Sequence, residues 1–148
     1  MNLLSRILRP VNVAHAHCDG PCGVYDPAVV RIAAEAVLSM EKKIAALGDA
    51  QDLATINTRT RFIAIKEQQA ELVKKELNIL WHDYFKPEHL EKYPNLHDIF
   101  WKAAKLGSKN KTEQDAANGE ALLAAIEEIH NIFWATKNRE VAFYRANP

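Results

Sequence analysis

Residues 26–48, DPAVVRIAAEAVLSMEKKIAALG, decide the fold class of this chain. Their apolar side chains recur at steps of three and four, at Val30, Ala33, Val37, Met40, Ile44 and Leu47. That spacing places them along one face of an α-helix. Asp26 is a favoured N-cap, Pro27 a favoured first helical residue and Gly48 a favoured stop. The stretch therefore predicts an amphipathic helix whose apolar face must be buried.

The same periodicity predicts three more helices, at about residues 57–82, 95–106 and 112–137. The apolar side of the first of these, interrupted by Gln69, would consist of Phe62, Ile65, Leu72, Leu77 and Leu80. Between it and the next helix, the aromatic segment 81–93 is broken at Pro87 and Pro94, which predicts a turn with a short helix.

The ends of the last two helices are predicted from local signals. Gly107 and Ser108 would end the helix over 95–106. Thr112 with Asp115 resembles a capping box that would open the helix over 112–137. The inner stripe of this last helix would be Leu122, Ile126, Ile129 and Phe133.

The composition agrees with an all-α protein of one domain. The 148 residues are 48% hydrophobic and include only five glycines and six prolines. Nineteen basic and nineteen acidic residues cancel, so no basic surface favours a nucleic acid or a membrane as partner. No apolar run approaches the roughly twenty residues that a membrane-spanning helix needs. We expect an up-and-down four-helix bundle over residues 26–138.

Residues 1–16, MNLLSRILRPVNVAHA, have neither the helical periodicity nor the charge pattern of the rest. Their final Ala-His-Ala is similar to a signal-peptide cleavage site, but Arg6, Arg9 and Pro10 interrupt the hydrophobic segment that a secretory signal needs. Two cysteines so close together also do not make a secreted disulfide scaffold. We interpret residues 1–16 as a propeptide that is removed, and we expect a cytoplasmic protein.

Residues 17–25, HCDGPCGVY, combine both cysteines with two glycines and a proline, which predicts a tight irregular loop. By spacing alone, Cys18 and Cys22 are compatible with a metal site, a redox disulfide or two inert thiols. Cleavage after Ala16 would free the amine of His17. A metal bound by that amine, by the ionised amide nitrogen of Cys18 and by the Cys18 sulfur would close two fused five-membered rings in one plane. The sulfur of Cys22 can take the fourth position of the square.

A planar set of two nitrogens and two sulfurs suits nickel(II), whereas zinc has no geometric preference of this kind. The imidazole of His17 could then reach only an apical position, where it could stabilise nickel(III). Thiolates and an ionised amide are strong donors that should lower the nickel potential to a range in which superoxide both reduces and oxidises the metal. If the loop binds nickel in this way, it supplies a one-electron couple; the redox disulfide and the two inert thiols stay open as alternatives.

The sequence HCDGPCGVYDP at residues 17–27 closely resembles the nickel hook, HCxxPCGxYDP, that opens mature nickel-containing superoxide dismutases. The resemblance continues through residues 65–68, 80–81, 83–87, 91–94, 96–97, 132–134 and 136–137. It implies a four-helix bundle that assembles as a homohexamer with one nickel ion per subunit. It also implies a maturation peptidase that cleaves immediately before His17, and an inactive uncleaved chain.

The resemblance also implies roles for single residues. The nickel ligands would be His17, Cys18 and Cys22. Tyr25 would line the approach of superoxide, with Asp19 nearby. Further candidates around this opening are Tyr84 and Lys86. The hook would span residues 17–25 of a mature domain over 17–148.

Two positions depart from the better-known members of that family. Ala33 stands where those members have a glutamate, and Gln69 where they have an arginine. In the family these two residues support the axial imidazole. We therefore expect unchanged ligands with different surroundings of His17.

Two classes of function are compatible with these residues. One is a superoxide dismutase that converts superoxide to dioxygen and hydrogen peroxide by a Ni(II)/Ni(III) cycle. The other is a non-catalytic nickel carrier or helical interaction protein that uses the same hook, with Met1 still attached. We expect the enzyme, since the hook sequence matches in detail.

The other histidines are better explained as surface or core hydrogen-bonding residues than as ligands. They are His82, His89, His97 and His130. Glu127 and His130 form a single Glu-x-x-His, whereas a di-iron bundle needs two such pairs and two more glutamates.

Overall fold

The computed structural model describes residues 23–146. This part of the chain is helical and contains no β-strand. Its elements are α2 (Ala28–Ala46), α3 (Leu53–Ile79), the π-helical turn η1 (Leu80–Tyr84), α4 (Pro87–Lys92), α5 (Leu96–Thr112) and α6 (Ala116–Thr136). The predicted all-α fold is therefore confirmed.

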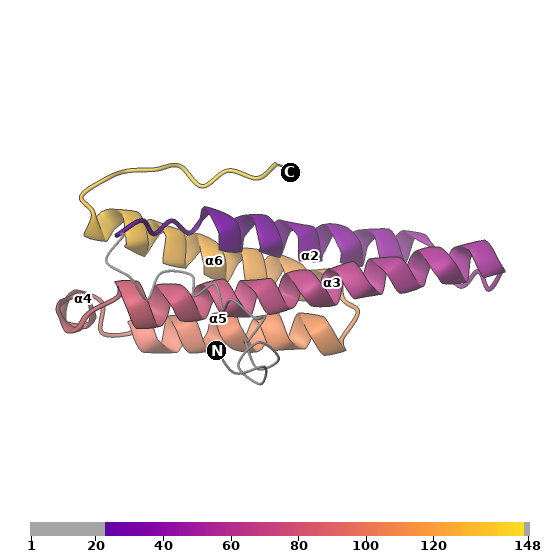
Figure 1. Cartoon of the computed structure of the whole chain (residues 1–148), viewed down its shortest axis with the longest axis horizontal. Helices are drawn as coiled ribbons and strands as arrows, with labels where there is room; N and C mark the ends of the chain where they lie inside the picture. Colours follow the sequence, from indigo (N-terminus) through magenta and orange to yellow (C-terminus); the bar gives the residue numbers. More distant parts are fainter. Residues whose placement is uncertain (1–22, 147–148) are drawn as a thin grey trace, which may run out of the picture.

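Four long helices, α2, α3, α5 and α6, run up and down and form the expected bundle (Figure 1). Each of them packs against two others, in the ring order α2, α3, α5, α6. The start of α2, the short helix α4 and the end of α6 lie together at one end of the bundle, which we call the α4 end. At the opposite end, the hairpin between α2 and α3 projects beyond α5 and α6.

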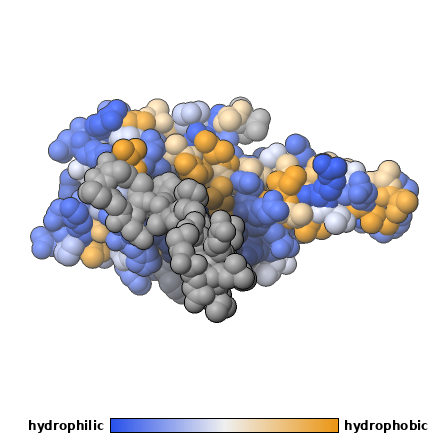
Figure 2. Space-filling view, in the orientation of Figure 1, coloured by the Kyte–Doolittle hydropathy of each residue, from blue (hydrophilic) through white to orange (hydrophobic). Residues whose placement is uncertain are grey.

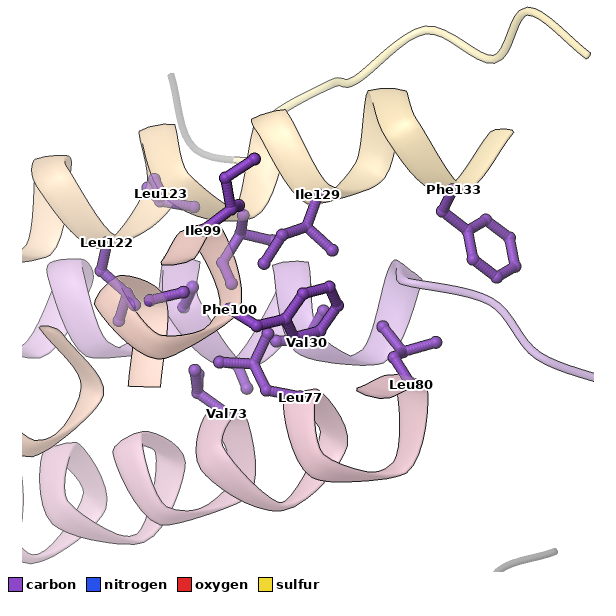
Figure 3. Packing of buried hydrophobic residues seen from close by; sticks show 14 of the residues in the cluster. Val30, Val73, Leu77, Leu80, Ile99, Phe100, Leu122, Leu123, Ile129 and Phe133 are labelled. Carbon is purple, nitrogen blue, oxygen red and sulfur yellow. The ribbon is translucent and has the colours of Figure 1, made fainter. Parts of the chain in front are cut away.

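The predicted apolar faces of the first and last helices are confirmed. Ala33 and Val37 of α2 are fully buried, as are Ile126 and Phe133 of α6. Side chains from all four helices meet in one core (Figure 3). The start of α2 is shifted by one residue from the prediction: Pro27 is the N-cap and Ala28 the first helical residue. The Asp26 carboxylate still accepts a hydrogen bond of 2.8 Å from the backbone N–H of Ala28.

The prediction for α3 was wrong in its start and in part of its core face. The helix begins at Leu53, because the Asp52 carboxylate accepts a hydrogen bond of 3.0 Å from the N–H of Thr55. Its buried residues are Lys66, Ala70, Val73 and Leu77. Ile65 is exposed, and Phe62 and Leu72 are only half-buried. Apolar residues lie on several faces of α3, so their periodicity does not identify the face that packs.

The predicted boundary between the last two helices was also wrong. Helix α5 continues through Gly107 and Ser108 to Thr112. Gly107 serves close packing on α3, since a Cβ built there would lie 3.1 Å from Cγ of Lys74. No capping box opens α6, because Thr112 still belongs to α5. Asp115 alone caps α6, since its carboxylate accepts a hydrogen bond of 2.9 Å from the backbone N–H of Ala117.

Away from the α4 end, each long helix contributes one buried polar side chain. These residues are Glu41, Lys66, Asn110 and Asn118. Nδ2 of Asn110 donates to the carbonyl of Asn118 at 3.1 Å, and Nζ of Lys66 donates to the carbonyl of Glu113 at 2.5 Å. Burial raises the pKa of Glu41 to about 7, and the positive charge of Lys66 opposes this only in part.

Glu41 is expected to make folding pH-dependent. Its pKa is higher in the folded than in the unfolded chain, so the folded state binds the additional proton. The free energy of unfolding should therefore fall by up to roughly 3 kcal/mol as the pH rises from 4.5 to 8. Glu41→Gln should flatten this part of the profile, as measured by urea denaturation at several pH values. The exposed control Glu88→Gln should keep the wild-type slope. Parallel profiles for Glu41→Gln and wild type would contradict the assignment.

Gly119 is expected to be required for the contact between α6 and α2. A Cβ there would lie 2.6 Å from Oε2 of Glu41 and 3.1 Å from Cα of Leu38. Gly119→Ala should therefore destabilise the fold by about 1–3 kcal/mol. The matched control is Gly107→Ala, where the flexible Lys74 side chain can move and helix propensity favours alanine by about 1 kcal/mol. Thermal unfolding compares the two; an equal response at both positions would refute this explanation.

Candidate metal centre

The three predicted ligands, His17, Cys18 and Cys22, lie outside the described residues, and so does Asp19. The described chain begins at Gly23, whose φ of +66° lies in the left-handed region that glycine adopts without strain. Val24 is exposed, and Tyr25 is the first residue that packs on the bundle. The described chain therefore starts at the α4 end.

Tyr25 is positioned by another tyrosine, Tyr84. Their ring centroids lie 5.7 Å apart with the ring planes inclined by 54°. The Tyr84 ring in turn lies 4.4 Å from that of Phe133 in the core and stacks on His89 at 5.6 Å. These distances are typical of favourable aromatic pairs. The predicted candidates Tyr25 and Tyr84 are thus brought together at one end of the molecule.

The hydroxyl of Tyr84 is fixed by Thr136 at the end of α6. The two hydroxyl oxygens lie 2.5 Å apart. Thr136 donates its only hydroxyl proton to the carbonyl of Phe133 at 2.6 Å, so Tyr84 must be the donor to Thr136. The proton of Tyr84 is therefore already used within the bundle.

The π-helical turn η1 determines where this tyrosine lies. It widens the last turn of α3 before Pro87 starts α4, and the N–H of Phe85 closes it onto the carbonyl of Leu80 at 3.0 Å. Phe85 is buried, whereas Lys86, the other predicted candidate, is exposed at the start of α4. The backbone N–H of Lys86 donates to Nδ1 of His89 at 3.0 Å.

A cavity of about 190 Å³ lies between this N-terminal segment and the end of α3. It is lined by Val24, Tyr25, Asp26, Val29, Glu76, Ile79 and Leu80. Glu76 is the one residue of α3 that brings a carboxylate to it. Nζ of Lys137 lies 5.1 Å from the centroid of the Tyr84 ring.

Several of these neighbours were not predicted as parts of the site. Glu76 and Thr136 lie on helices without a local motif, and their position next to Tyr25 and Tyr84 depends on how the helices pack. His89 is half-buried and accepts a backbone hydrogen bond, which fits the expected structural role. The buried His130 also has such a role, since its Nε2 lies 2.8 Å from the carbonyl oxygen of Val141.

The donor set available to a metal can be tested on the described residues. Between Gly23 and Ala146, no group of three His, Cys, Asp or Glu side chains could hold a metal ion. Both cysteines of the chain precede Gly23. Thiolate donors can therefore come only from the hook, where two sulfurs and the nitrogens of His17 suit nickel. The residues present fit this metal.

The two departures from the family pattern lie on α2 and α3. Ala33 is fully buried in the core, and Gln69 is half-buried. Ala33 belongs to the apolar face of α2, so a longer acidic side chain there would need both space and a buried partner.

No helix within residues 23–146 is long and apolar enough to span a membrane.

Comparison with known proteins identifies the family. The family described as nickel-containing superoxide dismutase matches residues 12–137. The nickel superoxide dismutases of Streptomyces seoulensis and Streptomyces coelicolor are 47% and 46% identical over 135 residues, which are 91% of this chain and 98% of each relative.

Solved structures agree with this result. A crystal structure of Ni-containing superoxide dismutase after partial X-ray-induced reduction matches with a TM-score of 0.75 and 48% identity, covering 83% of this chain and all of that chain. Three other matching structures are variants of nickel superoxide dismutase. In these variants, the histidine at position one, the aspartate at position three or the tyrosine at position nine is replaced.

The activity follows from these matches. The chain is an oxidoreductase that uses nickel to convert superoxide to dioxygen and hydrogen peroxide. The alternative of a non-catalytic nickel carrier is not favoured, because the matching relatives are enzymes. The chain belongs to the nickel-containing superoxide dismutase family.

Proposed function

We propose that His17, Cys18 and Cys22 hold the nickel ion after residues 1–16 have been removed. The observation that carries this proposal is the position of both cysteines immediately before a segment that packs on the bundle through Tyr25. The described part of the chain offers no alternative donor set. His17 would contribute its amine and its imidazole, and the cysteines would contribute thiolates.

The numbering of the solved relatives supports the proposed start of the mature chain. Counted from His17 as the first residue, Asp19 is the third and Tyr25 the ninth. These are the residue types and positions replaced in the three solved variants. The solved, partially reduced enzyme matches 83% of this sequence, whereas the Streptomyces seoulensis sequence matches 91%. This difference is expected if the solved chain lacks an N-terminal propeptide that the full sequence includes.

In this proposal the protein residues position the substrate, and the bound nickel supplies a one-electron couple. Tyr25 lines the approach of superoxide, and Asp19 lies nearby in the hook. The Tyr84 ring packs against the Tyr25 ring and holds it in place. Lys137 adds a positive charge at the same end, which favours an anionic substrate. Lys86 is a second candidate for this role.

We further propose a cytoplasmic homohexamer matured by a peptidase that cleaves before His17. Exposed apolar side chains on several faces of α3 support an oligomer, since a monomer would leave them in contact with water. These residues are Leu53, Ile56, Ile63 and Ile65. Apolar residues are visible on the end of the molecule that projects beyond α5 and α6 (Figure 2). Sedimentation of the processed, nickel-loaded protein tests the oligomer; a monomer at micromolar concentration would contradict it.

The test of the ligand set compares three forms of the chain, which begin at Met1, at Ala16 and at His17. Each is loaded with nickel, and superoxide dismutation is measured by pulse radiolysis. Only the His17 form should be active, because a single preceding residue converts the coordinating amine into an amide. The Ala16 form is the matched control, since it differs by one residue.

Equal activity of the three forms would contradict a role for the His17 amine. Nickel bound by all three forms without activity in any of them would instead favour the carrier.

The position of Tyr25 should depend on the ring of Tyr84 more than on its hydroxyl. Tyr84→Phe keeps the ring contacts, so its dismutation rate should stay within about twofold of wild type. Tyr84→Leu removes an aromatic pair worth about 0.5–1.5 kcal/mol and should lower the rate roughly two- to tenfold. The rates are compared at equal nickel content. If Tyr84→Phe were as slow as Tyr84→Leu, the hydroxyl and not the ring would be the important group.

A further inference from the structure

The residues after α6 form an extended segment that the family match does not include. The match ends at residue 137, and the described chain continues through residues 138–146, which we call the C-terminal strap. The strap turns back at the α4 end and runs over α6 toward α2 (Figure 1). It contains no helix or strand.

Side-chain and backbone contacts attach the first part of the strap to α6. The N–H of Arg139 donates to the carbonyl of Trp134 at 3.0 Å, and its guanidinium lies 4.9 Å from the Trp134 ring. The carbonyl oxygen of Val141 lies 2.8 Å from Nε2 of His130, whose ring also packs on Phe143 at 5.3 Å. These contacts place the last strap residues beside α2.

The last strap residues contact an ion pair on α2. A guanidinium nitrogen of Arg31 lies 2.6 Å from Oε1 of Glu35. Both residues are almost fully buried, with 4% and 7% of their surfaces exposed. The Tyr144 ring lies 4.2 Å from the Arg31 guanidinium carbon. The backbone N–H of Ala146 donates to the second carboxylate oxygen of Glu35 at 2.8 Å.

A buried ion pair is stable only if its remaining hydrogen-bonding capacity is used. Here the strap supplies a donor to the carboxylate and an aromatic face to the guanidinium. Arg145 adds a second connection, an ion pair of 2.9 Å with Glu120 of α6. The strap therefore links α6 to the first turns of α2.

Those turns directly follow the proposed metal hook. The N–H of Arg31 donates to the carbonyl of Pro27 at 3.1 Å, so Arg31 belongs to the first turn of α2, and Glu35 lies one turn further along. We propose that the C-terminal strap is a positioning element of the metal centre: through Tyr144 and Ala146 it holds Arg31 and Glu35, and with them the base of the hook. This inference rests on the proposed ligand set.

The test uses a chain that ends after Phe143. This variant keeps the strap contacts with Trp134 and His130 and removes those with Arg31 and Glu35. Because the removed residues lie outside every helix, the circular dichroism should stay unchanged. Lys42→Ala is the matched control, since it removes the other ion pair of Glu120, 3.0 Å long, and leaves the strap intact.

The first measurement is hydrogen exchange in the otherwise complete chain without nickel. Amides of residues 31–35 should exchange about tenfold faster in the shortened chain, while amides of residues 122–129 in α6 stay within about twofold. Lys42→Ala should leave both groups near wild type. Unchanged exchange at residues 31–35 would overturn the proposal, and so would an equal acceleration in all helices, which would indicate a general loss of stability.

The second measurement is the rate at which chains that begin at His17 release nickel to a chelator. The shortened chain should release the metal several-fold faster, and its activity directly after loading should stay within about twofold of wild type. Faster exchange with unchanged nickel release would overturn the role in the metal centre. Failure of the ligand set would appear separately, as a lack of nickel binding by the intact processed chain.

Discussion

The contact between the Tyr25 and Tyr84 rings connects the N-terminal segment to the bundle, and the arrangement of the α4 end depends on it. Tyr84 reaches this position because η1 widens the end of α3, because the Thr136 hydroxyl accepts a hydrogen bond from it and because Phe133 packs against its ring. The end of α3 with η1, and the end of α6, thus determine where the N-terminal segment packs. The proposed hook, residues 17–25, is too short to form a core of its own, so a contact of this kind is how the bundle would orient it.

The two ends of the bundle differ in chemistry. At the α4 end, an aromatic cluster of Tyr84, Phe85, His89 and Phe133 surrounds the hydrogen bond between the Tyr84 and Thr136 hydroxyls. The other part contains buried amide, ammonium and carboxyl groups, one from each long helix. The hydrogen bonds between Asn110 and Asn118 and between Lys66 and Glu113 form only in one relative position of α3, α5 and α6. We infer that this polar layer fixes the register of the helices, and that the register places Tyr84 opposite Tyr25.

The sequence alone predicts a helix and its buried face correctly where the apolar pattern of that helix matches the face that packs. The apolar faces of α2 and α6 were predicted correctly because each helix has one clear stripe. The buried face of α3 was predicted wrongly in part, because the apolar residues of this helix lie on several faces. Exposed ones such as Ile65 are compatible with subunit contacts. Gly107 was read as a stop, whereas it allows α5 to approach Lys74 of α3, which no local rule reveals.

The candidate site divides in the same way. His17, Cys18 and Cys22 can be proposed from the sequence because they lie within one short motif. Glu76, Thr136 and Lys137 come from distant segments, and only the folded chain shows them near Tyr25 and Tyr84. The strap has no periodicity, so its contacts with Arg31 and Glu35 could not be predicted.

We propose that nickel is bound by the two sulfurs of the hook and not by groups of the bundle. X-ray absorption at the nickel edge of the chain that begins at His17 measures this directly. We predict two sulfur neighbours, and one fewer in Cys22→Ser. A nickel ion surrounded only by oxygen and nitrogen would contradict ligation by Cys18 and Cys22.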